Sequence, residues 1–443
     1  MFRLIENEFI TWKNKEQHKP LLILGARQVG KTHSVLNFGN QYFKNVIYVN
    51  FESNPKFKEY FVDSLEPHKI LTYLENHFMH PINADTLIFF DEIQACEAAI
   101  TSLKYFYEQK PEMYIIAAGS LLGVALNNEN ISFPVGKVQT LKMNPMNFLE
   151  FLMANNKQLL IEAIKEAYKT NTKLDQPLHE DALNMYQKYM IIGGMPEVVK
   201  TYIETASYVQ SIGIIDEIYQ HYLNDMNKYT SKSEALKVKA CYQSITKQLQ
   251  KENKNFKYSV VMRGKNKQYF GSSLQWLINA GIAYEAKMLE NCNLPLAYHT
   301  DEFIFRMYLS DMGLFSKMTH TPINDLLNPL YRDDISGIWA ENYLACELQS
   351  EDIPLYYWRG KRDAEIEYVV QLDHKAIPID VKAGKNTGSF SINQFLLQNE
   401  DTPYAIKVSM KHFGFNNKIK NIPLYAVFCL VDEIKQEKFK DII

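Results

Sequence analysis

The sequence predicts an α/β protein in which a parallel β-sheet is followed by a helical region and then by a second α/β unit. Short apolar runs alternate with helical stretches in the first part, helical periodicity begins at about Asn147, and β-like runs return beyond about Thr300. At 443 residues the chain is too long for one hydrophobic core. We therefore expect three or four packed units.

The predicted sheet rests on four apolar runs in the first part of the chain. They are LLIL at 21–24, VIYVNF at 46–51, TLIFF at 86–90 and YIIAAG at 114–119. Each run is apolar enough to be buried on both faces, as strands of a parallel sheet covered by helices are.

The middle of the chain reads as helical from NFLEFLMANN to DALNMYQKYMIIGGMPEVV, where Gly193, Gly194 and Pro196 interrupt the pattern. This stretch predicts a helical lid. Farther on, apolar residues recur at helical spacing and predict a helix over 272–287; they are Leu274, Leu277, Ile278 and Ile282.

The last part predicts a second α/β unit. Its β-like runs are EFIFRMYLS, LYYWRG, EIEYVVQL, AIPIDVKAG and PLYAVFCL, and a helix is expected at ISGIWAENYLACELQS between the first two.

Composition excludes several classes of protein. With 46% apolar and 22% charged residues the chain is of the soluble globular type, and it contains neither a run long enough to span a membrane nor an N-terminal signal peptide. The five cysteines are scattered and never spaced as C-x-x-C, which argues against a disulfide framework and a zinc site. We expect a cytoplasmic protein that does not bind membranes.

A phosphate-binding loop (P-loop) follows the first apolar run. Gly25, Ala26, Arg27, Gln28, Val29, Gly30, Lys31 and Thr32 fit the pattern G-x-x-x-x-G-K-S/T, between a strand and a helix. Glycines let successive backbone N–H groups point at phosphates, and the helix N-terminus adds to their attraction. Lys31 is expected to contact the β- and γ-phosphates, and the Thr32 hydroxyl to ligate Mg²⁺. The cofactors predicted are ATP and Mg²⁺.

Two carboxylates end the third apolar run. Asp91 is expected to hold Mg²⁺ through its water shell, and Glu92 to orient and deprotonate the attacking water. Two adjacent acids after a strand are otherwise common helix-start residues. Ser120, after the fourth run, is a candidate to contact the γ-phosphate or the water, and a turn or N-cap role explains it equally well.

Charge is distributed unevenly. Between Lys228 and Phe270 there are eleven Lys or Arg residues and two acids, so this basic segment carries 11 − 2 = +9 in a chain whose net charge is −3. A polyanion would bind there.

The sequence resembles a family of bacterial and archaeal AAA-type ATPases with a C-terminal restriction-endonuclease-like domain of unknown function. The resemblance rests on LLILGARQVGKT, IYVNFE, TLIFFDEIQ, SLKYFYE, AAGSLLGV, SFPVGKV, GGMPEVV, YYWRG, EIEYVV and PIDVK. It implies a P-loop ATPase core at 1–146, a helical lid at 147–225, a winged-helix-like segment at 226–300 and a nuclease-like domain at 301–443. The resemblance also implies roles in nucleotide binding and hydrolysis for the residues at matching positions, which are Lys31, Thr32, Asp91, Glu92 and Ser120.

One departure from the resemblance concerns the arginine finger, which stabilises charge on the transferred phosphoryl group. The chain has no Arg between Arg27 and Arg263. Lys137, where relatives can carry Arg, is a candidate catalytic substitute, although lysine cannot make a bidentate clamp. We therefore expect slow, switch-like turnover.

Winged-helix modules bind duplex DNA with a helix in the major groove and basic residues on phosphates. Arg263, Lys265 and Lys267, beside the helix expected at 272–287, are the candidate DNA contacts. Lysine runs are also common on solvated faces, and winged helices often bind only proteins.

The final domain resembles PD-(D/E)xK nucleases. Glu341, Glu367, Asp380 and Lys382 match that order, with carboxylates to gather Mg²⁺ and a lysine to orient water. Glu367 stands where relatives more often have Asp, and Asp380 where they have Glu. The alternative is a salt-bridge network in a fold that only binds partners.

Two functions remain open from the sequence. The first is an ATP-dependent switch or motor acting on nucleic acid. The second is an ATP-gated protein-interaction module without DNA activity. Intact Glu92 favours hydrolysis, whereas the missing arginine favours a gate. The protein partners and the oligomeric state are not predicted.

Overall fold

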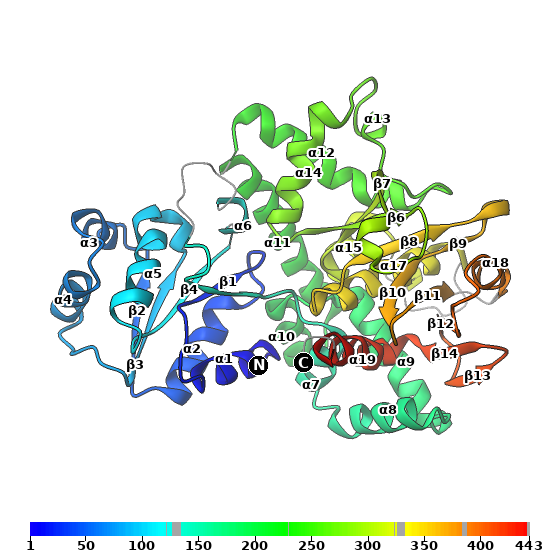
Figure 1. Ribbon diagram of the computed structural model, residues 1–443, viewed down its shortest axis with the longest axis horizontal. Coiled ribbons are helices and arrows are strands. Elements are labelled where there is room, and N and C mark those ends of the chain that lie inside the picture. Colours follow the sequence, from blue (N-terminus) through cyan, green and yellow to red (C-terminus); the bar gives the residue numbers. More distant parts are fainter. Residues whose placement is uncertain are drawn as a thin grey trace. The chain divides into compact units, whose positions relative to one another are not determined.

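The computed structural model describes residues 1–120, 122–125, 134–228, 230–322, 324–325, 333–382 and 388–440. Several residues of the predicted segments therefore lie outside the described residues, namely 121 of AAGSLLGV, 132 and 133 of SFPVGKV, 229 of the basic segment, and 383 and 384 of the strand predicted at AIPIDVKAG. The chain divides into two compact units, one of Met1–Asn144 with Asn279–Gly281 and one of Pro145–Ile278 with Ile282–Ile443 (Figure 1). The second unit contains most of the three later parts of the predicted four-part division.

A five-stranded parallel sheet forms the centre of the first unit, in the order β2-β3-β4-β1-β5. Its strands are β1 (Leu21–Leu24), β2 (Asn45–Asn50), β3 (Thr86–Asp91), β4 (Tyr114–Gly119) and β5 (Gln139–Lys142). The four predicted strands are confirmed to within one residue at either end. β5 was not predicted because it is short, polar and only half-buried at the sheet edge.

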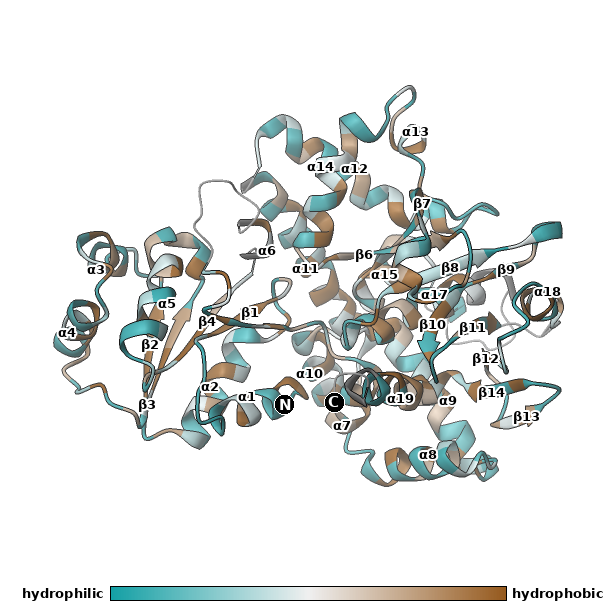
Figure 2. Cartoon of the chain, in the orientation of Figure 1, coloured by the Kyte–Doolittle hydropathy of each residue, from teal (hydrophilic) through white to brown (hydrophobic). Residues whose placement is uncertain are grey.

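Helices cover both faces of this sheet. They are α1 (Ile5–Lys13), α2 (Lys31–Tyr42), α3 (Phe57–Asp63), α4 (Pro67–Phe78), α5 (Glu97–Gln109) and the short α6 (Leu122–Ala125). Leu22, Ile88 and Ile115 on one face share a core with α3, α4 and α5. α2 packs so closely on the strands that a Cβ at Gly39 would lie 2.7 Å from the Val46 side chain and 2.9 Å from that of Leu87. Figure 2 shows β3 and β4 largely in the brown of hydrophobic residues.

The register of the parallel strands brings their carboxyl ends to one edge. Leu24 pairs with Gly119, Asp91 with Ala118, and Asn50 with Asp91. The residues that follow β1, β3 and β4 therefore meet at that edge, where ligands bind in parallel α/β sheets.

The second unit begins with the expected helices. They are α7 (Phe148–Ala154), α8 (Gln158–Thr170), α9 (Gln176–Ile192), α10 (Pro196–Thr205) and α11 (Tyr208–Lys228). α7 starts with a capping box, in which the Asn147 side chain accepts from Glu150 N and the Glu150 side chain accepts from Asn147 N.

Three helices and a β-hairpin follow. They are α12 (Lys232–Leu249), α13 (Tyr258–Val261), α14 (Lys267–Asn279), β6 (Ala283–Leu289) and β7 (Thr300–Leu309). The helix expected over 272–287 was wrong in its second half. It ends at Asn279, Gly281 takes a left-handed φ of 71°, and the chain continues as β6. Residues from Ala283 onward form a strand instead of a helix because they pair with β7, beginning with Ala283 opposite Leu309.

The rest of the unit contains two sheets, ordered β7-β6-β8-β9 and β10-β11-β12-β14-β13. The strands are β8 (Leu355–Arg359), β9 (Glu365–Ile366), β10 (Tyr368–Leu372), β11 (Lys375–Lys382), β12 (Ala405–Ser409), β13 (Gly414–Asn416) and β14 (Ile419–Pro423). The helices are α15 (Met312–Thr319), α17 (Asp333–Ser350), α18 (Phe390–Gln398) and α19 (Val427–Lys440). Within the described residues, every helix is too short or too polar to cross a membrane.

The strand predicted at PLYAVFCL was wrong. Leu424–Ala426 form a 3-10 turn, and α19 begins at Val427. A short, fully buried apolar run has the same pattern in a strand and in a helix, so periodicity could not separate them. Leu430, Val431 and Ile434 continue the helical spacing from Val427, and all are buried.

A Gly193-Gly194 turn after α9 packs against backbone. Gly194 N donates to Asp311 Oδ2 (2.6 Å), and Gly194 O accepts from Met146 N (2.7 Å). A Cβ at Gly194 would lie 2.0 Å from Met146 O. Only glycine fits this position.

Gly194→Ala is therefore expected to lower the free energy of unfolding by about 1–3 kcal/mol or more, because backbone must move to admit the methyl group. Gly213→Ala on α11 is the matched control. A Cβ there meets nothing within 4 Å, so alanine should stabilise by about 0.5–1 kcal/mol. Denaturant unfolding measures both changes, and equal midpoints for the two variants would contradict the packing described.

Candidate functional site

The P-loop lies between β1 and α2 and needs its glycines. Gly25 has a φ of 153°, and a Cβ there would lie 2.1 Å from Met143 O. Gly30 caps α2 with a φ of 97°. Both conformations are readily available only to glycine, so the loop can turn tightly and present its N–H groups at the start of α2.

The Lys31 side chain lies over this loop. The residue is only 6% exposed, and Nζ donates to Gly25 O (2.8 Å) and Ala26 O (2.7 Å). Burial lowers the pKa of Lys31 to about 8, although Glu92 and Asp91 act to raise it. A buried ammonium held mainly by neutral carbonyls is suited to an anionic ligand.

Asp91, at the end of β3, collects several donors. Oδ2 accepts from Thr32 Oγ1 (3.0 Å), Tyr48 OH (2.9 Å) and Asn50 Nδ2 (3.2 Å). Oδ1 accepts from Glu92 N (3.0 Å). Burial, and then the charge of Glu92, raise the pKa of Asp91, while the hydrogen bonds oppose the shift.

Glu92 is positioned by an unusual backbone and by two side chains. Its φ of 49° is left-handed. Oε2 accepts from Gln94 Nε2 (2.5 Å) and Ser120 Oγ (3.1 Å). The structure therefore brings together five residues singled out in the sequence from three separate segments, namely Lys31, Thr32, Asp91, Glu92 and Ser120.

Tyr48, Asn50 and Gln94 belong to this site and were not predicted. Tyr48 and Asn50 stand two apart on β2, and so side by side on the strand next to β3. The signal in the sequence was two hydrogen-bonding side chains within the apolar run VIYVNF.

The structure does not bring Lys137 to this site. Lys137 precedes β5, whose first residue Gln139 pairs with Leu21, whereas the P-loop follows Leu24 at the other end of β1. Its ammonium pairs with Glu108 Oε1 at 3.0 Å. Lys137 therefore lies at the opposite end of β1 from the P-loop of its own chain, and its role as a substitute for the arginine finger stays a prediction.

Thr32 and Asp91 are a fitting but incomplete set of ligands for Mg²⁺. Their oxygens lie 3.0 Å apart at the P-loop. Mg²⁺ in such sites is held by one or two protein oxygens, by water and by the phosphates of the nucleotide. Among the described residues no group of three His, Cys, Asp or Glu could hold a metal by itself. The pair therefore fits a metal that arrives with a nucleotide.

The candidate DNA contacts lie together on the surface. Arg263, Lys265 and Lys267 are exposed at the turn between α13 and α14. The ammonium of Lys265 lies 4.4 Å from the ring centre of Tyr269, and that of Lys267 lies 5.4 Å from the ring centre of Phe303.

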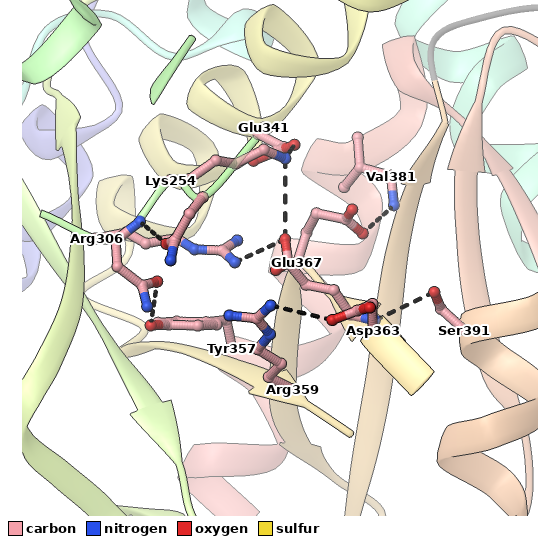
Figure 3. A network of polar contacts seen from close by, with 12 residues as sticks. Lys254, Arg306, Glu341, Tyr357, Arg359, Asp363, Glu367, Val381 and Ser391 are labelled. Atoms are coloured by element: carbon pink, nitrogen blue, oxygen red, sulfur yellow. Dashed lines mark hydrogen bonds and ion pairs between the residues drawn. The ribbon is translucent and has the colours of Figure 1, made fainter. Parts of the chain in front are cut away.

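The candidate nuclease residues converge in one polar network of the second unit, in which Figure 3 labels Glu341 and Glu367. Lys382 Nζ lies 2.7 Å from Asp380 Oδ1 and 3.7 Å from Glu367 Oε1, and Glu367 Oε2 accepts from Val381 N at 3.0 Å. Burial, and then Glu367, raise the pKa of Asp380 to about 6. Burial raises the pKa of Glu341, and Glu367 adds to that shift.

Two cationic side chains missed in the sequence belong to the same network. Lys254 pairs with Glu341, and Arg306 pairs with Glu365 Oε1 at 2.6 Å. Arg306 is 1% exposed, and its guanidinium lies 4.0 Å from the ring centre of Tyr357. Salt bridges thus surround the predicted nuclease acids.

Comparison with known protein families finds three matches along the chain. Residues 17–152 match the family described as "AAA domain", residues 183–325 match "Domain of unknown function (DUF8612)", and residues 336–427 match "Domain of unknown function (DUF4143)". Among curated proteins, none matches the chain by sequence.

Solved structures with similar folds include a Walker-type ATPase of Pyrococcus abyssi, at 13% identity, over 72% of this chain and 96% of that one, with a TM-score of 0.45. The ORC2 protein of Aeropyrum pernix, in ADPNP and ADP complexes, matches at 11% identity over 76% and 94%, with a TM-score of 0.36. AMPPCP-bound DnaA of Aquifex aeolicus matches at 16% identity over 57% and 76%, with a TM-score of 0.27. The family match at residues 17–152 agrees with the parallel sheet and the P-loop of the first unit, which together form a P-loop ATPase fold of the AAA type.

Proposed function

We propose that the protein binds ATP with Mg²⁺ at the P-loop and hydrolyses it slowly, as a nucleotide-dependent switch that acts on nucleic acid. The observation that carries this proposal is the meeting of Lys31, Asp91 and Glu92 at one sheet edge. Thr32 Oγ1 lies 3.0 Å from Asp91, and Ser120 Oγ lies 3.1 Å from Glu92. Such an arrangement holds phosphates, a metal and a water-activating carboxylate within one site.

Each residue has a separate task in this proposal. Lys31 exchanges the carbonyls of Gly25 and Ala26 for β- and γ-phosphate oxygens. Thr32 and Asp91 would hold Mg²⁺, which supplies charge neutralisation on the phosphates when bound. Glu92 orients the attacking water and accepts its proton.

Slow turnover is supported by the small number of cations near the site. Arg27 lies in the P-loop, and its NH2 approaches Glu52 Oε2 at 3.5 Å. Lys137 pairs with Glu108 at the opposite end of β1 and β5. The chain has no arginine between Arg27 and Arg263, and the Arg3 guanidinium donates to the carbonyls of Val29 and Asn144. Few arginines in the first 262 residues can therefore stabilise charge in the transition state.

Action on nucleic acid is supported by the charge of +9 between Lys228 and Phe270 and by the exposure of Arg263, Lys265 and Lys267. The order α12, α13, α14 and then the hairpin β6-β7 suits a winged helix, with α14 as the helix that approaches DNA. Lysine and arginine there would contact phosphates.

The second candidate function is an ATP-gated protein-interaction module. The salt bridges around Glu341, Glu367 and Asp380 favour it, because acids paired with Lys254 and Lys382 are not placed to gather Mg²⁺. In that case the nuclease-like domain binds partners and does not cleave nucleic acid.

Substitutions at Lys31 and Glu92 separate binding from hydrolysis. Lys31→Ala should abolish ATP binding, because the charge directed at the phosphates is lost. Glu92→Gln should bind ATP like the parent and release phosphate at least about a hundredfold more slowly. Calorimetry and a phosphate-release assay measure the two steps, with exposed Lys44→Ala as control. Equal loss of binding in both variants would refute the role of Glu92.

ATP binding should weaken at high pH. Burial lowers the pKa of Lys31 to about 8. Phosphates favour the charged ammonium, so the affinity should be nearly full at pH 7 and fall about tenfold between pH 7 and pH 9 as the free protein loses this proton. Lys31→Arg, whose charge persists over this range, should show no such fall. A pH-independent affinity in the parent protein would contradict the assignment.

DNA binding should depend steeply on salt, by roughly 0.9 log unit per log unit of salt for each phosphate neutralised. Replacing Arg263, Lys265 and Lys267 together with Ala should flatten the slope. A matched triple variant of the exposed Lys169, Lys173 and Lys200 should leave it unchanged. Fluorescence anisotropy with labelled duplex measures the slope. Absence of binding at low salt, with and without ATP, would remove nucleic acid from the proposal.

A further inference from the structure

The hairpin β6-β7 carries an aromatic side chain that the fold leaves uncovered. Phe303 on β7 is 76% exposed, and among the described residues it is the most exposed phenylalanine. Phe305, two residues farther along the strand, is buried and stacks on Phe256 with ring centres 5.8 Å apart. The core thus uses the second phenylalanine of β7 and not the first, so burial of the Phe303 ring contributes little to folding.

The backbone holds this ring outward at an irregularity of the strand pair. Pairing with β6 is interrupted between Thr300 and Phe305, so residues 301–304 form a bulge. Asp301 Oδ1 accepts from the N–H groups two and three residues farther on, at 2.6 and 2.9 Å. These bonds fix the bulge and turn the Asp301 carboxylate toward the backbone, while Phe303 projects from it.

Basic side chains lie beside Phe303. The ammonium of Lys267, the first residue of α14, is 5.4 Å from the centre of the Phe303 ring. Burial raises the pKa of Glu285 on β6, and the charges of Lys287 and Lys267 oppose this shift, so both lysines act on the same side chain of the hairpin. The exposed turn 263–266 precedes α14 and adds two further basic residues.

An exposed aromatic ring next to several cations matches one class of ligand. Bases of a nucleic acid stack on aromatic faces, and neighbouring ammonium and guanidinium groups bind the phosphates. In intact duplex DNA each base is stacked within the helix, and taking it out of the stack costs free energy. A free base face is therefore offered mainly by unpaired nucleotides.

We infer that Phe303 stacks on an unpaired base next to duplex DNA, so that this surface binds junctions between paired and unpaired strands in preference to intact duplex. The inference rests on the proposed binding of nucleic acid through Arg263, Lys265 and Lys267 and specifies the form of DNA that is bound. The turn before α14 contacts phosphates of the duplex, while β7 presents its ring to a base beyond the paired region.

The test measures binding of full-length protein to three labelled DNAs by fluorescence anisotropy, with and without ATP. They are a fully paired duplex, the same duplex with a central bubble of mismatched thymines, and one strand of the bubble alone. The two duplexes have identical ends and differ only in their unpaired bases. The bubble should bind at least roughly fivefold more tightly than the paired duplex, because stacking of one base on an aromatic ring contributes that much or more.

Substitutions at Phe303 identify the cause of this preference. Phe303→Ala should bring the ratio of the two affinities close to one. Phe303→Leu should do the same, because leucine is apolar and offers no aromatic face, whereas Phe303→Trp should keep the preference. The matched control is Phe415→Ala, which removes an exposed phenylalanine of β13 and should behave like the parent.

Salt dependence provides the second measurement. Stacking releases no counterions, so Phe303→Ala should weaken binding to the bubble without changing the slope of log affinity against log salt. Replacing Arg263, Lys265 and Lys267 together should instead flatten that slope.

Equal affinity of the parent for the bubble and the paired duplex would overturn the inference and leave the proposed action on nucleic acid intact. A Phe303→Leu variant that keeps the preference would indicate an apolar wedge in place of stacking and would overturn it as well. The same holds if the single strand binds as tightly as the bubble. If the parent binds none of the three DNAs, the inference falls together with the proposed action on nucleic acid.

Discussion

The candidate nucleotide site depends on the buried carboxylate of Asp91. It is 3% exposed, and hydrogen bonds from Thr32, Tyr48, Asn50 and the Glu92 backbone reach its two oxygens. These donors come from the start of α2, from β2 and from the end of β3. A buried carboxylate stripped of such partners costs about 3–5 kcal/mol, so the bonds that satisfy Asp91 also fix the elements around it.

The same carboxylate connects the site to the surface beyond β2. Asn50 donates to Asp91 while its Oδ1 accepts from the backbone N–H groups of Glu52 and Ser53. Glu52 in turn pairs with Arg27 of the P-loop. A ligand that draws Asp91 or Arg27 toward itself therefore changes the partners available to the segment after β2.

The carboxylates of the second unit have two different kinds of partner. Asp311 binds the Gly194 N–H and caps α15, with a pKa that burial raises to about 6 while backbone hydrogen bonds oppose the shift. Glu341, Glu365, Glu367 and Asp380 instead rely on lysine and arginine side chains. Asp311 is thus satisfied by neutral N–H donors, whereas the four other carboxylates are neutralised by charged side chains.

The sequence by itself determined the four main strands of the first sheet, the P-loop, and the acids and serine that meet it, because parallel strands bring their carboxyl ends to one edge whatever the details of packing. It also placed Glu341, Glu367, Asp380 and Lys382 in a shared region. Tertiary structure alone decided that 283–289 is a strand and 427–440 a helix, because apolar runs adopt whichever form their neighbours bury. It decided too that Tyr48 and Asn50 serve Asp91, that Lys137 lies away from the P-loop, and that Lys254 and Arg306 neutralise the nuclease-like acids. Each of these depends on which residues distant in the chain become neighbours, and no local pattern specifies that.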